Sequence, residues 1–182
     1  KRKKNIKMKK FEPIFNGLSA ALVICVLSAL TFESSVGVWL MFSFGSTALI
    51  VFVFYDSEFA KPKNVFFGHL VSIIIGILFN HYMGISTISL GLSVGFCVTV
   101  MMYLKIVHPP AAANPLIALF ADVSYDFVLF PVITGSLVLI VLSSFINRTM
   151  LGRKQLKKKS NSIILSKNLK KRRKRTIKNK EA

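Results

Sequence analysis

Acidic residues are scarce in this sequence, since Asp and Glu together number 7 of its 182 residues. None of them lies inside a long apolar run, so a buried carboxylate pair, a metal cage or a pump built on a membrane-embedded Asp or Glu has little to be made from. The sequence also contains no Walker or dinucleotide-binding glycine loop and no CxxC, HExxH or GxSxG motif. We therefore expect no enzyme activity, no metal and no cofactor.

Cysteine is almost absent as well. The two that occur, Cys25 and Cys97, each stand in the middle of an apolar run. This placement argues against a disulfide framework and against a thiolate metal site. It predicts that both cysteines are small buried side chains.

Hydrophobic residues are abundant: they make up 53% of the chain and give a mean hydropathy of +0.57. This composition is too apolar for an ordinary soluble domain and predicts an all-α, polytopic transmembrane helix bundle. Six membrane segments are expected, at residues 14–32, 36–55, 64–79, 87–104, 109–121 and 128–146. The first is better explained as a signal anchor than as a signal peptide, because further spans follow it.

The net charge of +18 is concentrated at the two ends of the chain. Residues 1–10 and 151–182 are basic segments that flank a membrane domain at residues 11–150. Because Lys and Arg accumulate on the cytoplasmic side, both ends are expected in the cytoplasm, most simply at the inner (plasma) membrane of the cell. An even number of crossings places both ends on the same side, so six crossings fit the charges and five do not. The count of six includes the short segment at residues 109–121 as the fifth crossing.

The basic tails have a simple interpretation as contacts to anionic lipid of the bilayer. Nucleic-acid binding is disfavoured, because no aromatic residues for stacking are interleaved with the cations. Pairs of small residues one helical turn apart, Gly17 with Ala21 and Gly91 with Gly95, predict close helix packing. The sequence leaves open whether the chain forms a homo-oligomer.

Three of the six prolines fall within the stretch His108-Pro-Pro-Ala-Ala-Ala-Asn114-Pro115. Each proline lacks an N–H group and disfavours the helical conformation of the residue before it, so a regular helix cannot pass through this stretch. Irregular backbone at membrane depth is tolerated where protein or a water-filled cavity satisfies its polar groups. The stretch therefore predicts a broken helix that lines a site, with a proline turn outside the membrane as the alternative.

A weak internal repeat places this stretch opposite a second one. A shift of 67 residues pairs Gly68 with Gly135 and lays residues 44–47 over residues 111–114. Six spans would make the two halves run in opposite senses, so the sequence predicts a 3+3 inverted repeat of the kind that many transporters contain.

The chemistry offered by these two stretches suits a small anion. Helix starts present backbone N–H groups and the positive end of the helix dipole, and hydroxyl, amide and imidazole groups add neutral donors. The binding candidates come from both breaks and from the third span; they are Gly45, Ser46, Thr47, His69, His108, Pro109, Pro110 and Asn114. His69 and His108 each have an alternative interpretation, as an interior or helix-end histidine with satisfied hydrogen bonds.

Three motifs in order, His108-Pro-Pro-Ala-Ala, Phe44-Gly-Ser and residues 56–70 with Gly68-His69, resemble the HPP family of integral membrane proteins. The resemblance covers roughly residues 11–153. It implies a small multi-span membrane protein suspected of transport, and some plastid and cyanobacterial relatives are implicated in nitrite movement. Members are usually described with four spans, and they commonly have glycine and threonine shortly after the tripeptide, where this chain has Ala112, Ala113 and Asn114.

The leading hypothesis from the sequence is a permease or channel for a small inorganic anion, with nitrite as the candidate that the resemblance suggests. The alternative is a membrane scaffold or sensor that transports nothing and whose basic tail binds anionic lipid or a partner.

Overall fold

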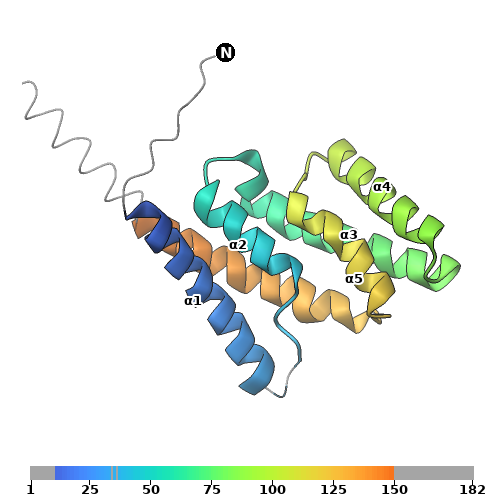
Figure 1. Cartoon of the computed structure of the whole chain (residues 1–182), viewed down its shortest axis with the longest axis horizontal. Helices are drawn as coiled ribbons and strands as arrows, with labels where there is room; N and C mark the ends of the chain where they lie inside the picture. The colour runs from blue at the N-terminus through green and yellow to red at the C-terminus, as the bar shows by residue number, and fades with distance from the viewer. Residues whose placement is uncertain (1–10, 34, 36, 150–182) are drawn as a thin grey trace, which may run out of the picture. The chain divides into compact units, whose positions relative to one another are not determined.

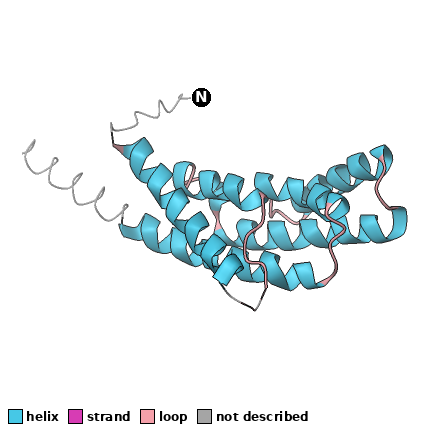
Figure 2. Cartoon of the chain, turned by 60° about the horizontal axis from the view of Figure 1, so that its bottom comes forward, coloured by secondary structure: helices cyan, strands magenta, loops and turns pink. Residues whose placement is uncertain are grey.

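A computed structural model describes residues 11–33, 35 and 37–149 of the chain; the basic ends and their expected contacts lie outside these residues. Within this part the secondary structure is helical and contains no strand (Figure 2). The contacts described below all lie within residues 11–144. The α-helices are α1 (Glu12–Glu33), α2 (Ser43–Val53), α3 (Pro62–Met83), α4 (Thr87–Tyr103) and α5 (Asn114–Phe120). Short 3₁₀ turns occur at Glu58–Ala60 (η1) and Pro109–Ala113 (η2), and a last helix covers Val128–Thr149.

Three of these helices are long and apolar enough to cross a membrane: α1, α3 and Val128–Thr149, each of 22 residues. At a rise of about 1.5 Å per residue, α1 and α3 are each about 33 Å long, which matches the thickness of a bilayer core. The third is kinked near its start, where Val128–Ile133 form a π-helix (η3) and the backbone of Phe130 is not helical. The shorter helices α2 and α4 are apolar as well, and α5 has 7 residues. Helices thus occur in all six of the expected segments, and whether all six cross the bilayer stays a prediction.

The second expected segment begins with irregular backbone. Residues 37–41 have no regular structure, and α2 starts only at Ser43. The hydroxyl of Thr31 on α1 accepts hydrogen bonds from the amides of Trp39 and Leu40, at 3.0 and 3.1 Å. These bonds explain how non-helical backbone is accommodated here, because the partners that lipid lacks come from the neighbouring helix.

Helix α3 is the central element of the bundle and contacts α4, α5, η1 and η2 (Figure 1). It begins with Pro62; proline suits this position because the N–H groups of a first helical turn have no partner within the helix. It ends at Met83 and is followed by Gly84, which adopts a φ of +61°. Gly76 allows α5 to approach closely, since a Cβ atom there would lie 2.7 Å from both Pro115 Cα and Ala118 Cβ. The close approaches predicted at Gly17, Gly91 and Gly95 are not made within the described chain, where nothing lies within 4 Å of an added Cβ.

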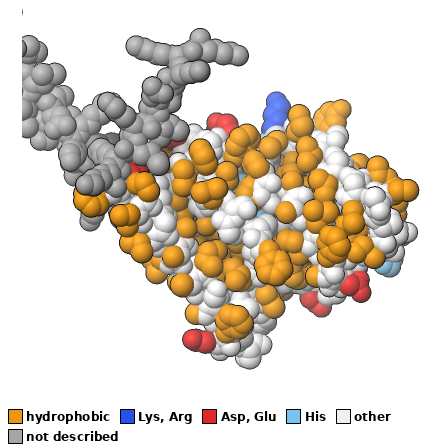
Figure 3. All heavy atoms as spheres, viewed as in Figure 1, with side chains coloured by type: hydrophobic (Ala, Val, Ile, Leu, Met, Phe, Trp, Pro, Cys, Tyr) orange, Lys and Arg blue, Asp and Glu red, His pale blue; other side chains and the backbone are white. Residues whose placement is uncertain are grey.

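The outer surface of the helices is apolar, as a lipid-facing surface must be. Large hydrophobic side chains cover the face seen in Figure 3, and the few charged ones lie at its edges. The expectation that both cysteines are buried holds for Cys97 and is wrong for Cys25, which is exposed on α1. A position inside an apolar run does not decide which side of a membrane helix faces the protein interior.

Candidate functional site

Six uncharged polar side chains meet in the interior of the bundle, and we call this group the polar cluster. Two come from α2, two from α3, one from the residue before η2 and one from the start of α5. Each is at most 4% exposed; the six are Ser43, Thr47, His69, Ser72, His108 and Asn114. Helical spacing explains the pairs, because residues three or four apart share one face of a helix. The cluster therefore joins α2 and the broken stretch before α5 to the central helix. The break expected at residues 45–47 is wrong, because α2 is continuous there and the irregular backbone precedes it.

Asn114 connects the serine of α2 to the two cluster residues of α3. Its side-chain oxygen accepts a hydrogen bond from Ser43 Oγ at 2.8 Å, and its amide nitrogen donates to Ser72 Oγ at 2.7 Å. The same nitrogen lies 3.0 Å from His69 Nδ1 and 3.3 Å from the His69 carbonyl oxygen. A carbonyl requires a donor, so this last contact fixes which end of the amide carries the hydrogens.

Thr47 bridges the two histidines. Its Oγ1 lies 2.9 Å from His69 Nε2 and 3.0 Å from His108 Nε2, and it also donates to the Ser43 carbonyl oxygen at 3.0 Å. The far nitrogen of His108, Nδ1, lies 2.8 Å from the carbonyl oxygen of Phe59 in η1. The two imidazole rings contact each other edge to face with centroids 5.0 Å apart.

Packing holds the rings in place. Phe44 meets His69 edge to face at 5.2 Å, and Gly68 gives His108 room beside α3, because a Cβ on Gly68 would lie 2.8 Å from His108 Cβ. Among the described residues no Lys, Arg, Asp or Glu side chain is buried, so the two histidines are the only ionisable groups of the polar cluster.

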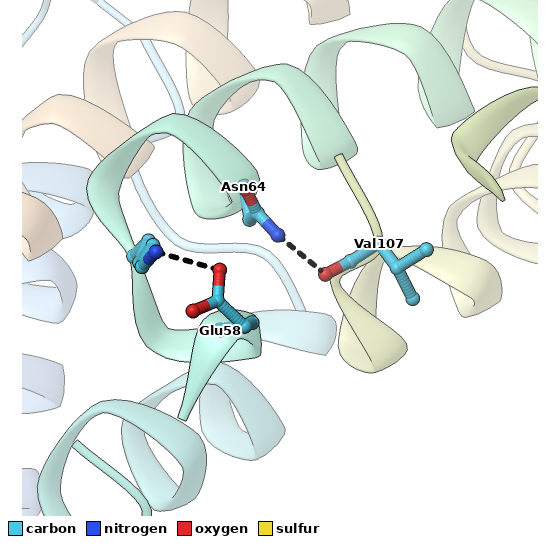
Figure 4. A network of polar contacts seen from close by, with 4 residues as sticks. Glu58, Asn64 and Val107 are labelled. Carbon is cyan, nitrogen blue, oxygen red and sulfur yellow. Dashed lines mark hydrogen bonds and ion pairs between the residues drawn. The ribbon is translucent and has the colours of Figure 1, made fainter. Parts of the chain in front are cut away.

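The backbone break before η2 is held from the side of α3. Asn64 Nδ2 donates to the carbonyl oxygen of Val107 at 3.1 Å, beside the exposed ion pair of Glu58 with Lys61 at 2.6 Å (Figure 4). An exposed pair of this kind contributes little to stability. The asparagine bond matters more, because it supplies a donor to a carbonyl that the broken helix cannot satisfy.

The amides expected to be free at the two helix starts are in fact used. Phe44 N bonds to Met41 O at 2.9 Å, Gly45 N to Phe42 O at 3.3 Å and Ala111 N to His108 O at 2.9 Å. The donors that converge in the structure are therefore side chains, and the expectation of free backbone amides at Gly45 and Ala111 is wrong for this conformation.

The structure brings together half of the predicted binding residues. Thr47, His69, His108 and Asn114 belong to the polar cluster, and Pro110 is buried next to it. Three others lie at the surface; they are Gly45, Ser46 and Pro109. Sequence reasoning missed Ser43 and Ser72, although each stands one helical turn from a residue that was chosen, and that spacing could have found them.

The cluster lies toward one end of α3. His69 is seven residues from Pro62, so it lies about 10 Å from that end of a helix about 33 Å long. It is therefore closer to the loop that carries η1 than to the middle of the helix. A cavity of about 530 Å³ lies elsewhere, between residues 37–38 and residues 123–130.

One close contact occurs twice at the spacing of the internal repeat. A Cβ on Gly68 would meet the carbonyl oxygen of Ile106 and the side chain of Ala111, and a Cβ on Gly135 would meet the carbonyl oxygen of Trp39 and the ring of Phe44. Corresponding partners differ by the same 67 positions. The chain at residues 106–111 is thus packed against Gly68 of α3, and the chain at residues 39–44 is packed against Gly135 of the last helix.

A comparison with known proteins decides the family. The sequence model described as HPP, transmembrane region, matches residues 6–156, which is most of the chain and includes the whole polar cluster. The chain belongs to the HPP family. The resemblance found in the His108-Pro-Pro stretch is thereby confirmed, and the HPP chain is an integral membrane protein.

Two relatives of this HPP chain are transmembrane proteins of Dictyostelium discoideum. One is 28% identical over 148 residues, covering 75% of this chain and 48% of the relative, and the other is 24% identical over 141 residues, covering 73% and 48%. The chain thus spans about half the length of the curated relatives it matches. No solved structure matches it.

Proposed function

We propose that this HPP protein is a permease or channel for a small inorganic anion, with nitrite as the first candidate, and that the polar cluster is where the anion passes. The observation that carries the proposal is the cluster itself: six buried polar side chains that meet inside an apolar bundle. Polar groups are costly to place in a membrane protein and usually mark the path of a substrate or ion.

The chemistry of the cluster favours an anion. Hydroxyl, amide and imidazole N–H groups can all donate hydrogen bonds, and the cluster holds no carboxylate that would repel negative charge. Neutral donors bind an anion without holding it as firmly as a buried Lys or Arg would, and a transported ion must be able to leave.

The fold supports movement around this point. The residues that meet there come from α2, from α3 and from the broken stretch before α5. The paired contacts of Gly68 and Gly135 are what a 3+3 inverted repeat with six crossings would produce. In the proposed mechanism the breaks shift against α3, the hydrogen bonds of the cluster open, and an anion takes the place of the internal partners. In the proposed arrangement the protein lies in the plasma membrane and both of its basic ends are in the cytoplasm.

The test is uptake by proteoliposomes that contain the purified full chain. Nitrite, nitrate, formate and chloride are offered separately at neutral pH, with empty vesicles as the baseline. Uptake of at least one anion above this baseline is expected. Equal rates in protein-containing and empty vesicles for all four would reject the proposed function.

Replacing His108 with alanine is expected to reduce anion uptake by about tenfold or more, because the change removes a donor and opens a gap between Thr47 and the Phe59 carbonyl. His81 on the exposed end of α3 provides the matched control, since His81→Ala removes an imidazole outside the cluster. Uptake that is the same in both variants would contradict a role for His108 in permeation.

Truncation after Arg153 separates transport from the scaffold alternative. We expect the truncated chain to keep most of its anion uptake, because the polar cluster lies wholly before that residue. A truncation that abolished the biological effect of the protein, in a chain that moved no anion, would favour a scaffold or sensor whose basic tail binds anionic lipid.

A further inference from the structure

The protonation of both imidazoles in the polar cluster is fixed by neighbours that can act in only one way. His108 Nδ1 faces the carbonyl oxygen of Phe59, which only accepts, so this nitrogen carries a hydrogen. His69 Nδ1 faces the amide nitrogen of Asn114, which only donates, so this nitrogen presents its lone pair. In the neutral rings the remaining nitrogens have opposite roles: His69 Nε2 donates, and His108 Nε2 accepts.

Thr47 lies between these two nitrogens and completes a directed chain. Its hydroxyl oxygen accepts from His69 Nε2 at 2.9 Å, and its hydrogen can be given to His108 Nε2 at 3.0 Å or to the Ser43 carbonyl oxygen at 3.0 Å. Rotation of one O–H bond therefore connects the chain or interrupts it. When it is connected, every donor points the same way, from Asn114 through both histidines to Phe59.

The charges around the cluster show why such a chain is needed. The charged side chains on α2 to α5, on the loops between them and just after α5 lie at exposed positions; they are Asp56, Glu58, Lys61, Lys63, Lys105 and Asp122. The other ionisable groups of this part are Tyr55, His81, Tyr82, Tyr103 and the buried thiol of Cys97. An anion that enters this buried interior finds no Lys or Arg to pair with, and an unpaired buried charge is strongly unfavourable. Within the cluster, only the histidines can become cationic.

We propose that the polar cluster carries a proton together with each anion, and that His69, Thr47 and His108 form the path of that proton. This inference rests on the proposed anion transport and adds its coupling. An anion that accepts the amide hydrogens of Asn114 draws them away from His69 Nδ1, which then becomes free to bind a proton. The pair that occupies the site is neutral overall.

The transfer balances as follows. A proton binds at His69 Nδ1; the His69 Nε2–H bond breaks as a new O–H bond forms on Thr47; and the original Thr47 O–H bond breaks as an N–H bond forms on His108 Nε2. One proton enters, one positive charge moves from His69 to His108, and nothing is oxidised or reduced. His108 then releases its Nδ1 proton to water near Phe59, whose side chain is 42% exposed at the loop.

The experiment measures anions and protons in the same proteoliposomes. The full chain is reconstituted with a pH-sensitive dye in the lumen, the membrane potential is clamped with potassium and valinomycin, and an inward nitrite gradient is applied. Wild-type vesicles should acidify as nitrite enters, with one proton for each anion above the empty-vesicle baseline.

Thr47→Val removes the bridging hydroxyl and keeps the branched shape of the side chain. We expect the ratio of protons to anions to fall about tenfold, because the chain is interrupted at its middle. Thr47→Ser restores a hydroxyl and should restore the ratio. Thr99→Val is the matched control, since the Thr99 hydroxyl is exposed on α4 and bonds only within its own helix, to Gly95 O at 2.9 Å.

The possible outcomes separate the two proposals. Nitrite uptake without lumenal acidification in wild type would overturn the proton path and leave anion transport standing. Proportional loss of both fluxes in Thr47→Val, with the ratio unchanged, would also overturn it, because a merely structural role predicts that result. Failure of all four anions to enter would reject the proposed function itself.

Discussion

Changing Gly76 to valine should destabilise the folded bundle by about 3 kcal/mol or more, because the site has no room for a side chain. A Cβ atom there would lie 2.7 Å from the Cα atom of Pro115 and 2.7 Å from Ala118 Cβ. Backbone cannot move aside as the end of a flexible side chain does, so α5 would have to separate from α3. The change would be measured as a lowered melting temperature of the detergent-solubilised protein by circular dichroism.

Gly95→Val is the matched control for this prediction. It introduces the same side chain in the interior of another helix, where nothing lies within 4 Å of an added Cβ. Its melting temperature should stay close to that of the wild type. The change in helix propensity from glycine to valine is small compared with the energetic cost of a steric clash. Similar shifts in the two variants would show that the contact between α3 and α5 does not determine the stability of the bundle.

Changing Asn114 to leucine should have the largest effect on both stability and transport. Leucine has nearly the same size and shape, but it offers no partner to Ser43 Oγ, His69 Nδ1 or Ser72 Oγ, which Asn114 holds now. Each buried polar group left without its partner costs about 1–3 kcal/mol, so a total of about 3 kcal/mol or more is expected. Anion uptake should fall to the level of empty vesicles.

Asn80→Leu is the control for the asparagine prediction. Asn80 lies on the same bundle but donates to the exposed carboxylate of Asp122, at 2.6 Å, where water can replace the lost bond. We expect a change of about 1 kcal/mol or less and unchanged uptake. If Asn80→Leu and Asn114→Leu shift the melting temperature equally, the polar cluster does not have the energetic importance argued from its burial.

The positions of the long helices could be predicted from the sequence, because apolar runs bounded by polar residues locate them well. The break at residues 108–115 was predictable for a similarly local reason, since proline acts on its own backbone and on the residue before it. The late start of α2 was not. It depends on the hydroxyl of Thr31, which binds the amides of Trp39 and Leu40 from another helix.

The candidate site was predictable only in part, because a helix turns by about 100° per residue. Of the neighbours Gly45, Ser46 and Thr47, only Thr47 faces the interior, and the hydropathy of the segment gives no sign of this. Polar residues at helical spacing, such as Ser43 with Thr47 and His69 with Ser72, were the better signal. That both histidines share one hydroxyl is a tertiary fact that no local pattern contains.

The order of the cluster along the chain has a consequence for how the protein is made. Ser43, Thr47, His69 and Ser72 are synthesised first, while His108 and Asn114 follow 36 and 42 positions after Ser72. At about 5–20 residues per second, the ribosome needs roughly 2–8 s to add that interval. During that time the four cluster residues on α2 and α3 make three of the eight side-chain hydrogen bonds that join the members of the finished cluster, and the Ser43 hydroxyl still lacks Asn114. The polar site is therefore completed only after the start of α5 has been synthesised.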